Sequence, residues 1–288
     1  MKPAIRNAVS ALLMLACTLA WGQPLPLSLT AMPKDAPTLR IDGLLDDAAW
    51  LDAKPFSQFR RFRPDTQLDV GPYRTEVKVL MEPGALVFGI RTWDPSPQDI
   101  RAPLARRDQI FPDQDAVTVW IDPNGRSEIA QFVRVNAAGS ISDGIYRAID
   151  GDEDATPDYF DVEVAAHRLR DGYSVEIRWP LSVLRYPLDG KLPWGLMVTR
   201  RVPRDISMAF ASAPVERTHP HLLTQLQRFD LDAALREQLN GTQHISLRAE
   251  GTARVLDDGV GTRESTANLG LELQWRPRAD WEIGRAHV

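Results

Sequence analysis

Two segments near the end of the chain show the clearest alternation of apolar and polar positions. In "HISLRAEGTARV", apolar or small residues alternate with polar ones from Ile245 to Val255, and "ANLGLELQWR" repeats the pattern from Ala267 to Trp275. A period of two predicts strands with one apolar face. Each run has roughly ten residues, the length that a tilted strand needs to cross a bilayer. A polar loop joins the runs and the tight turn "RPRAD" follows them. The pattern predicts the start of an outer-membrane β-barrel over residues 243–281, with a hairpin on a soluble core as the alternative.

The segment 38–205 has a different pattern, in which shorter strands are separated by turn residues. "YRTEVKVLM" and "ALVFGIRTWD" flank "EPG", and "DAVTVWIDP" and "IAQFVRVNAAGSISDGIY" surround Pro-Asn-Gly. "YFDVEVAAHRLRDGYSVEIRW" reads as another hairpin around Asp-Gly. Only "LDDAAWLDA" and "PLSVLRY" look like helical turns. We therefore expect an all-β fold, an antiparallel, jelly-roll-like β-sandwich.

The two ends of the chain indicate processing. Residues 1–22 combine Lys2 and Arg6 with an apolar run and small residues before Gln23, which is typical of a secretory signal peptide. Cys17 lies within it; lipidation of this cysteine is an alternative, because Met14 replaces the usual leucine. A proline-punctuated leader covers 23–37 and a linker is expected over 206–242. The last residues, 282–288, match the translation of a sequencing adapter, so we expect the natural chain to continue as a barrel.

Composition excludes several classes of function. The formal net charge is −5, which argues against nucleic acid as a partner. The only cysteine is Cys17, so the mature chain has neither a disulfide nor thiol chemistry. The sequence contains no nucleophile elbow, no H-E-x-x-H motif and no phosphate-binding glycine loop. A non-catalytic role is therefore favoured, and the enzyme question stays open.

The order of several segments resembles a known family. "IDGLLDDAAW", "TEVKVLMEPGALVFGIRTWD", "DQDAVTVWIDP", "AQFVRVNAAGSISDG", "DGYSVEIRWPLSVLRY" and "WGLMVTRRVPR" are similar to the family 9 carbohydrate-binding module. More closely, they resemble an uncharacterised bacterial family in which such a module precedes an outer-membrane β-barrel. The resemblance implies a β-sandwich of sugar-binding ancestry. It departs from the family at "TPDYFDVEV", where a Trp-Asp pair is often found.

Saccharide binding needs flat aromatic rings and polar groups that bond hydroxyls. Core or edge packing is the competing interpretation for Trp93 and Trp179, which lie at predicted strand ends. For Trp50, core packing is the interpretation we favour. The candidate ligand-binding residues are Trp93, Trp179, Tyr146 and Tyr159, with Arg91, Asp94 and Arg107 as polar partners.

Acidic loops raise the question of a metal. Asp113 and Asp115 in "FPDQDAV" are the candidate ligands, because calcium prefers oxygen ligands from loops. "DGDEDATPDYFD" has EF-hand-like spacing but lacks the glycine at its sixth position and flanking helices. No cofactor is required, and calcium is the only candidate ion.

These patterns together predict the carbohydrate-binding domain of an outer-membrane protein. Its partners would be a saccharide and, through the C-terminal barrel, the outer membrane, with the sandwich on the periplasmic side of the cell envelope. Two alternatives remain. The module could be an accessory to a glycoside hydrolase in carbohydrate catabolism, or a structural plug of the barrel that binds no sugar.

Overall fold

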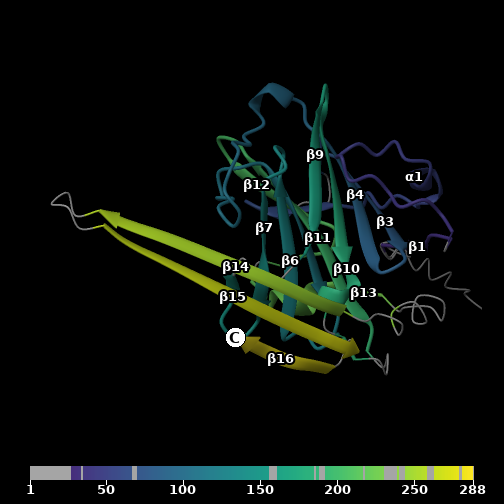
Figure 1. Ribbon diagram of the computed structural model, residues 1–288. Helices are drawn as coiled ribbons and strands as arrows, with labels where there is room; N and C mark the ends of the chain where they lie inside the picture. Colours follow the sequence, from purple (N-terminus) through teal and green to yellow (C-terminus); the bar gives the residue numbers. More distant parts are fainter. Residues whose placement is uncertain are drawn as a thin grey trace, which may run out of the picture.

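In the computed structural model, the regular secondary structure consists mainly of β-strands (Figure 1). The described residues are 27–33, 35–66, 70–155, 161–184, 186–187, 192–216, 218–229 and 239, together with the strand backbones of 244–257, 263–278 and 281–287. Within them, two sheets form a sandwich and a third sheet follows in sequence. The predicted all-β sandwich is therefore confirmed.

Sheet A has five strands in the order β1-β3-β4-β10-β9. Strand β1 pairs parallel to β3, and the other pairs are antiparallel. The β3–β4 and β9–β10 hairpins are those that the turn residues predict. The strands are β1 (Leu29–Ala31), β3 (Thr75–Glu82), β4 (Ala85–Trp93), β9 (Glu163–Leu169) and β10 (Gly172–Pro180).

Sheet B has the order β2-β12-β11-β5-β6-β7-β8, and β13 pairs with β11. Because β12 and β13 belong to it, the sandwich continues beyond residue 205, and the linker predicted from 206 begins too early. The strands are β2 (Arg60–Arg63), β5 (Ala116–Asp122), β6 (Ile129–Asn136), β7 (Ile141–Arg147), β8 (Asp152–Asp154), β11 (Trp194–Pro203), β12 (Ser207–Ala211) and β13 (Gln227–Phe229).

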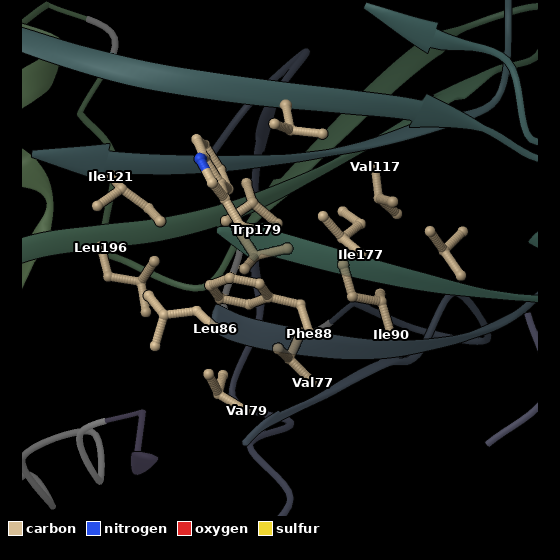
Figure 2. Packing of buried hydrophobic residues seen from close by; sticks show 14 of the residues in the cluster. Val77, Val79, Leu86, Phe88, Ile90, Val117, Ile121, Ile177, Trp179 and Leu196 are labelled. Atoms are coloured by element: carbon tan, nitrogen blue, oxygen red, sulfur yellow. The ribbon is translucent and has the colours of Figure 1, made fainter. Parts of the chain in front are cut away.

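The core lies between the two sheets, as Figure 2 shows. Alternate residues of β5 point inward, and Val117 and Ile121 meet Phe88 and Ile177 of sheet A. Each of these four side chains is fully buried. At about 25 cal/mol per Å² of apolar surface removed from water, this layer is the main source of stability.

Within residues 27–229, the helical segments of the described part of the chain are single turns. The helix α1 (Ala49–Asp52) is the predicted turn around Trp50, and η2 (Leu181–Val183) is the turn after Pro180. The other two are η1 (Pro97–Asp99) and η3 (Leu222–Gln225). None of the helices in the described part of the chain is long and apolar enough to span a membrane.

Trp50 closes the outer side of sheet A. It is 1% exposed, and its indole Nε1 donates to Glu176 Oε1 at 3.0 Å. The other carboxylate oxygen accepts the backbone N–H groups of Asp42 and Gly43 at 3.0 and 2.9 Å. Gly43 has φ +86°, and a Cβ there would lie 2.6 Å from the carbonyl carbon of Ala166. The prediction that Trp50 is a core residue is confirmed.

A third sheet follows the sandwich in sequence. Strands β14 (His244–Asp257), β15 (Arg263–Arg278) and β16 (Trp281–His287) pair antiparallel in that order. The predicted hairpin between the two alternating segments is therefore present. Strand β16 includes most of the tail that the sequence attributes to an adapter. Residues 1–26 and most of the segment "DLDAALREQLN", within the predicted linker, lie outside the described residues.

Candidate functional site

The outer face of sheet B is the side turned away from sheet A, and it carries polar and aromatic groups together. Because side chains alternate along β5, Val117 and Val119 point into the core while Thr118 and Trp120 point outward. Directly paired residues share a face, so the register places Arg134 of β6 and Thr199 of β11 beside Thr118. This face is the candidate functional site.

Arg134 is fixed at the centre of this face. Its Nη1 and Nη2 donate to Glu153 Oε2 and Oε1 at 3.0 and 2.7 Å, and its Nε donates to Thr118 Oγ1 at 3.1 Å. The residue is only 8% exposed. Three of the five guanidinium N–H groups of Arg134 donate hydrogen bonds to Glu153 and Thr118. These bonds hold the guanidinium in one orientation and so preorganise its remaining donors.

Aromatic rings pack beside Arg134. The Trp120 ring lies 5.4 Å from that of Phe132 and 5.8 Å from that of Tyr146, the latter at an interplanar angle of 88°. The Trp120 indole N–H donates to Thr199 Oγ1 at 3.1 Å. Tyr146 is partly exposed, and burial raises the pKa of its hydroxyl, so that it stays a neutral donor and acceptor. A rigid, half-exposed tyrosine suits stacking against a sugar ring.

Part of this face is covered by the chain that follows β12. Ala213, Val215, Leu223 and Leu226 form a cluster with Trp120 and Phe132. The outer face therefore has two parts: a polar part around Arg134, and an apolar part that this segment covers.

Phe111 is an aromatic residue that the sequence reasoning passed over. It is 60% exposed, although its ring is large and apolar. Its carbonyl oxygen accepts a hydrogen bond from Arg201 Nη1 at 2.9 Å, which ties its loop to β11. The signal was present in "QIFPDQD", where a single aromatic residue stands among polar ones just before a strand.

A second polar group fills one end of the sandwich interior. Asp94 Oδ2 lies 2.7 Å from Arg204 and 3.5 Å from Arg200, and Asp115 Oδ2 lies 2.8 Å from Arg204. The side chains of Arg200 and both aspartates are 0% exposed. Burial raises the pKa of Asp115 despite these contacts. A surface hollow of about 460 Å³ lies over this end, lined by Gln98, Asp99, Ile100, Arg101, Arg204 and Asp205.

The predicted ligand residue Asp94 therefore has a structural role. Its carboxylate also caps the backbone N–H of Ser96 at 2.9 Å. Breaking a buried pair by removing one partner is costly because it strands the other charge. The Asp94 side chain is fully buried and bound by arginines, so it is a poor contact for a sugar hydroxyl.

Trp93 and Arg91 lie on the opposite face of the molecule, on the outer side of sheet A. The guanidinium carbons of Arg74 and Arg91 lie 4.5 and 4.6 Å from the centre of the Trp93 ring. Arg91 also pairs with Asp171. Cation–π contacts of this kind occupy the space that a pyranose face would need. The structure thus brings Trp93 and Arg91 together, but away from Tyr146.

Trp179 was wrongly predicted to contact a ligand. It is 0% exposed and packs between the sheets, as Figure 2 shows. On β10 it pairs with Leu86, whereas Gly172 at the other end pairs with Trp93, so the two tryptophans lie at opposite ends of the strand. The sequence placed it at a strand end but could not show that this end was covered.

Arg107 and Tyr159 complete the predicted ligand residues. Arg107 pairs with Asp143, whose side chain is 0% exposed, and so attaches the 101–110 loop to β7. This arrangement gives Arg107 a structural role. Tyr159 lies outside the described residues.

The predicted metal ligands Asp113 and Asp115 do not converge. Asp113 is exposed, whereas Asp115 is buried and accepts hydrogen bonds from Arg204 and the Arg101 N–H. Both residues precede β5, which begins at Ala116, and lie in a turn segment where strand alternation does not set the direction of the side chains. Among the residues that the structure describes, no group of three His, Cys, Asp or Glu side chains is arranged to hold a metal ion.

Comparison with solved structures found similar chains. The structure is similar to that of a candidate carbohydrate-binding protein from Bacteroides uniformis ATCC 8492, with a TM-score of 0.52 and 12% identity over 71% of this chain and 99% of that one. A family 9 carbohydrate-binding module from Caldicellulosiruptor kristjanssonii also matches. Its complex with cellotriose gives a TM-score of 0.44 and 20% identity over 64% of this chain and 83% of that one. Its complex with glucose gives 0.44 and 19% over 64% and 84%.

No family model matches the sequence, and no curated protein matches it. The Bacteroides likeness, at its low identity, establishes the β-sandwich and nothing about the ligand. The class of protein that the fold and the site define is therefore a two-sheet β-sandwich with a polar and aromatic outer face.

Proposed function

We propose that the chain is a non-catalytic saccharide-binding protein and that the outer face of sheet B is its binding surface. The observation that carries the proposal is that one face holds both a fixed guanidinium, that of Arg134, and the partly exposed ring of Tyr146. Sugars offer hydroxyl groups around their rims and apolar C–H faces, and this pair presents a partner for each.

Rigidity supports the proposal. Arg134 is held by Glu153 and Thr118, and Tyr146 packs edge-on against Trp120. Immobilising a flexible side chain on binding costs about 0.5–1.5 kcal/mol, and a side chain that is already ordered avoids that cost. The similar fold of the Bacteroides protein, described as a candidate carbohydrate binder, is consistent with this proposal.

The same contacts support a non-catalytic role. Both oxygens of Glu153 accept hydrogen bonds from Arg134, so this acid braces the arginine. Glycoside hydrolysis needs two carboxyl groups placed across the scissile bond. The carboxylate of Glu153 on this face is held in an ion pair with Arg134 and is therefore poorly suited to act as a catalytic acid or base.

Binding to a glycan array, followed by calorimetry with the best ligand, tests the proposal. Tyr146→Ala should lower the affinity about tenfold, the equivalent of about 1.4 kcal/mol. Trp93→Ala is the matched control, because it removes an aromatic ring from the opposite side of the molecule. Loss of binding in Trp93→Ala with retention in Tyr146→Ala would place the site elsewhere. If no glycan on the array binds, the alternative of a structural plug without sugar binding is favoured.

The location in the cell envelope is a further proposal, and the sequence supports it. The signal-like residues 1–22 and the alternation of 243–281 carry it, with the sandwich expected on the periplasmic side. Fractionation of cells that express the full-length gene tests it. Recovery of the protein in the outer-membrane fraction is expected, and recovery in the cytoplasm would contradict it.

A further inference from the structure

Two arginines, Arg201 and Arg63, lie next to the proposed saccharide site, and neither forms an ion pair with a described residue. Arg201 of β11 is paired in register with Ala209 on one side and Ala116 on the other. Ala209 is in turn paired with Arg63 of the edge strand β2. Paired residues share a face, so Arg63 and Arg201 stand on the same side of the sheet with only a methyl group between them.

The register sets the distance between the two arginine backbones. Neighbouring strands are about 4.8 Å apart, so the two arginine backbones are separated by about 10 Å. Arginine side chains can span that distance from both sides and converge over Ala209. The residue between the two arginines is Ala209, whereas Ala116 lies on the far side of Arg201 and is buried.

The local charge favours an anion. Arg134 on this face is matched by Glu153, but in the described part of the chain neither Arg201 nor Arg63 forms an ion pair. The hydrogen-bond partner found for Arg201 is the neutral carbonyl of Phe111.

The surroundings of Arg201 make its charge costly without a counter-ion. Burial, followed by repulsion from Arg134, lowers the pKa of Arg201 to about 10. Attraction by Glu153 opposes this shift, and the repulsion from Arg63 and the attraction by Asp113 are smaller. An anion bound here would relieve that repulsion. The chain as a whole is acidic, with a net charge of −5, so general attraction of anions does not explain the cluster.

We propose that Arg201 and Arg63 bind the carboxylate of an acidic sugar residue, so that the ligand class of this site is an acidic saccharide. The planar fork of arginine matches a carboxylate through two parallel hydrogen bonds, which gives specificity as well as affinity. This inference rests on the proposed function: it identifies the ligand class of the same face, with Tyr146 and Arg134 contacting the sugar ring beside the carboxylate.

The test compares acidic polysaccharides with neutral forms of the same shape. The full chain is titrated with polygalacturonate, alginate and hyaluronate, and with the methyl-esterified form of each. Esterification removes the charge and keeps the sugar. At least one free acid should bind at least about tenfold more tightly than its ester, because hydrogen bonds to charged groups are about twice as strong as neutral ones.

Variants then assign the preference to residues. Arg201→Gln and Arg63→Gln should each reduce the free-acid affinity toward that of the ester, while Arg91→Gln, on the outer side of sheet A, should leave it unchanged. Arg201→Lys keeps the charge without the planar fork and should give an intermediate loss. Thermal unfolding of each variant verifies that it is folded.

The outcomes separate the two proposals. Equal affinity for acids and esters in the wild-type chain, with binding that Tyr146→Ala weakens, overturns the carboxylate site and leaves the proposed function standing. Equal binding of dextran sulfate would show general attraction of polyanions and would also overturn the carboxylate site. If neither neutral nor acidic glycans bind, both proposals fail.

Discussion

Arg134 shows how a single residue can be structural and functional at once. It braces β8 through Glu153, and it lies on the outer face of sheet B that we propose as the binding surface. Its neighbour Thr118 supplies a third fixed contact. The sequence alone could indicate that Arg134 lies in a strand. It could not show that Arg134 of β6 forms an ion pair with Glu153 of β8.

Replacing Arg134 tests this double role. Arg134→Lys keeps a positive charge but cannot bond both oxygens of Glu153 in one plane. We expect an affinity loss of about tenfold for the saccharide and a loss of unfolding free energy of about 1 kcal/mol. Calorimetry and urea unfolding measure the two effects. A loss of stability with unchanged affinity would make Arg134 purely structural.

Asp115 gives the interior cluster a pH dependence. Burial raises its folded-state pKa above the ordinary value of 3.8, so the folded state binds the proton more tightly than the unfolded state. Its contribution to stability is fully present below about pH 3.8 and is lost as the pH rises through the folded-state pKa.

The comparison with Asp115→Asn isolates this contribution, since asparagine does not titrate in this range. The unfolding free energy of the wild type, relative to that of the variant, should be larger at pH 4 than at pH 8. Urea unfolding at a series of pH values measures the difference. A difference that grows as the pH rises would mean that the folded-state pKa is lowered instead.

The tryptophans show what residue types reveal and what they hide. Trp50 follows a turn and a helical segment, and its position predicted a core role that its 1% exposure confirms. Trp179 and Trp93 end strands in the same way in the sequence, yet one is in the core and the other faces outward beside two arginines. Which face a strand end exposes depends on the opposing sheet, which a local pattern does not contain.

At the scale of elements, β8 is the short strand on which the site depends. It pairs with β7 and carries Glu153, the partner of Arg134. Gly144 makes this close approach possible, because a Cβ there would lie 2.2 Å from the carbonyl oxygen of Asp154. The glycine is therefore required for packing of β8.

Gly144→Ala should displace β8 and release Arg134, so we expect saccharide affinity to fall at least about fivefold while the core remains folded. Gly151→Ala is the control, since its position has φ +64° but open space around it. That change should cost about 1 kcal/mol of stability without loss of binding. Equal binding losses in both variants would contradict a specific role for Gly144.

The hairpins could be predicted from sequence, whereas the contribution of β12 and β13 could not. Turn residues between alternating runs are a local signal, and they correctly gave β3–β4 and β9–β10. Strand β13 has three residues, Gln227–Phe229, and pairs with one end of β11. Such a short strand has no periodicity to detect, and only its long-range partner defines it.

At the scale of the whole molecule, the sandwich depends on a residue beyond its last strand. Leu239 is 3% exposed within the core cluster, and its carbonyl accepts a hydrogen bond from the buried Tyr186 hydroxyl at 3.0 Å. The sandwich therefore ends after Leu239 and not at Phe229.

Truncation tests this boundary. A fragment of residues 27–243 should unfold cooperatively, while one of residues 27–229 should be less stable by about 2–4 kcal/mol, the cost of a lost buried leucine and an unpaired hydroxyl. The two melting temperatures, measured by circular dichroism, decide the matter. Equal stability would show that Leu239 is dispensable.

The site is harder to predict than the fold because it is an assembly of residues from separate strands. Tyr146 was among the candidates, but Arg134, Phe111 and Arg201 were not. These residues come from the β5–β6–β7 sheet segment, the loop before it and β11, and only their register brings them together. Residue type and spacing therefore suggested candidate residues, and strand pairing showed which of them share a surface.

The most direct test of the saccharide-binding face is oxidative footprinting of the full chain with and without its best glycan ligand. Side chains covered by the ligand should react less with hydroxyl radicals. We expect protection of Tyr146 and Phe111 and no change at Trp93, which lies on the other side of the molecule. Protection at Trp93 with none at Tyr146 would contradict the account and move the site to sheet A.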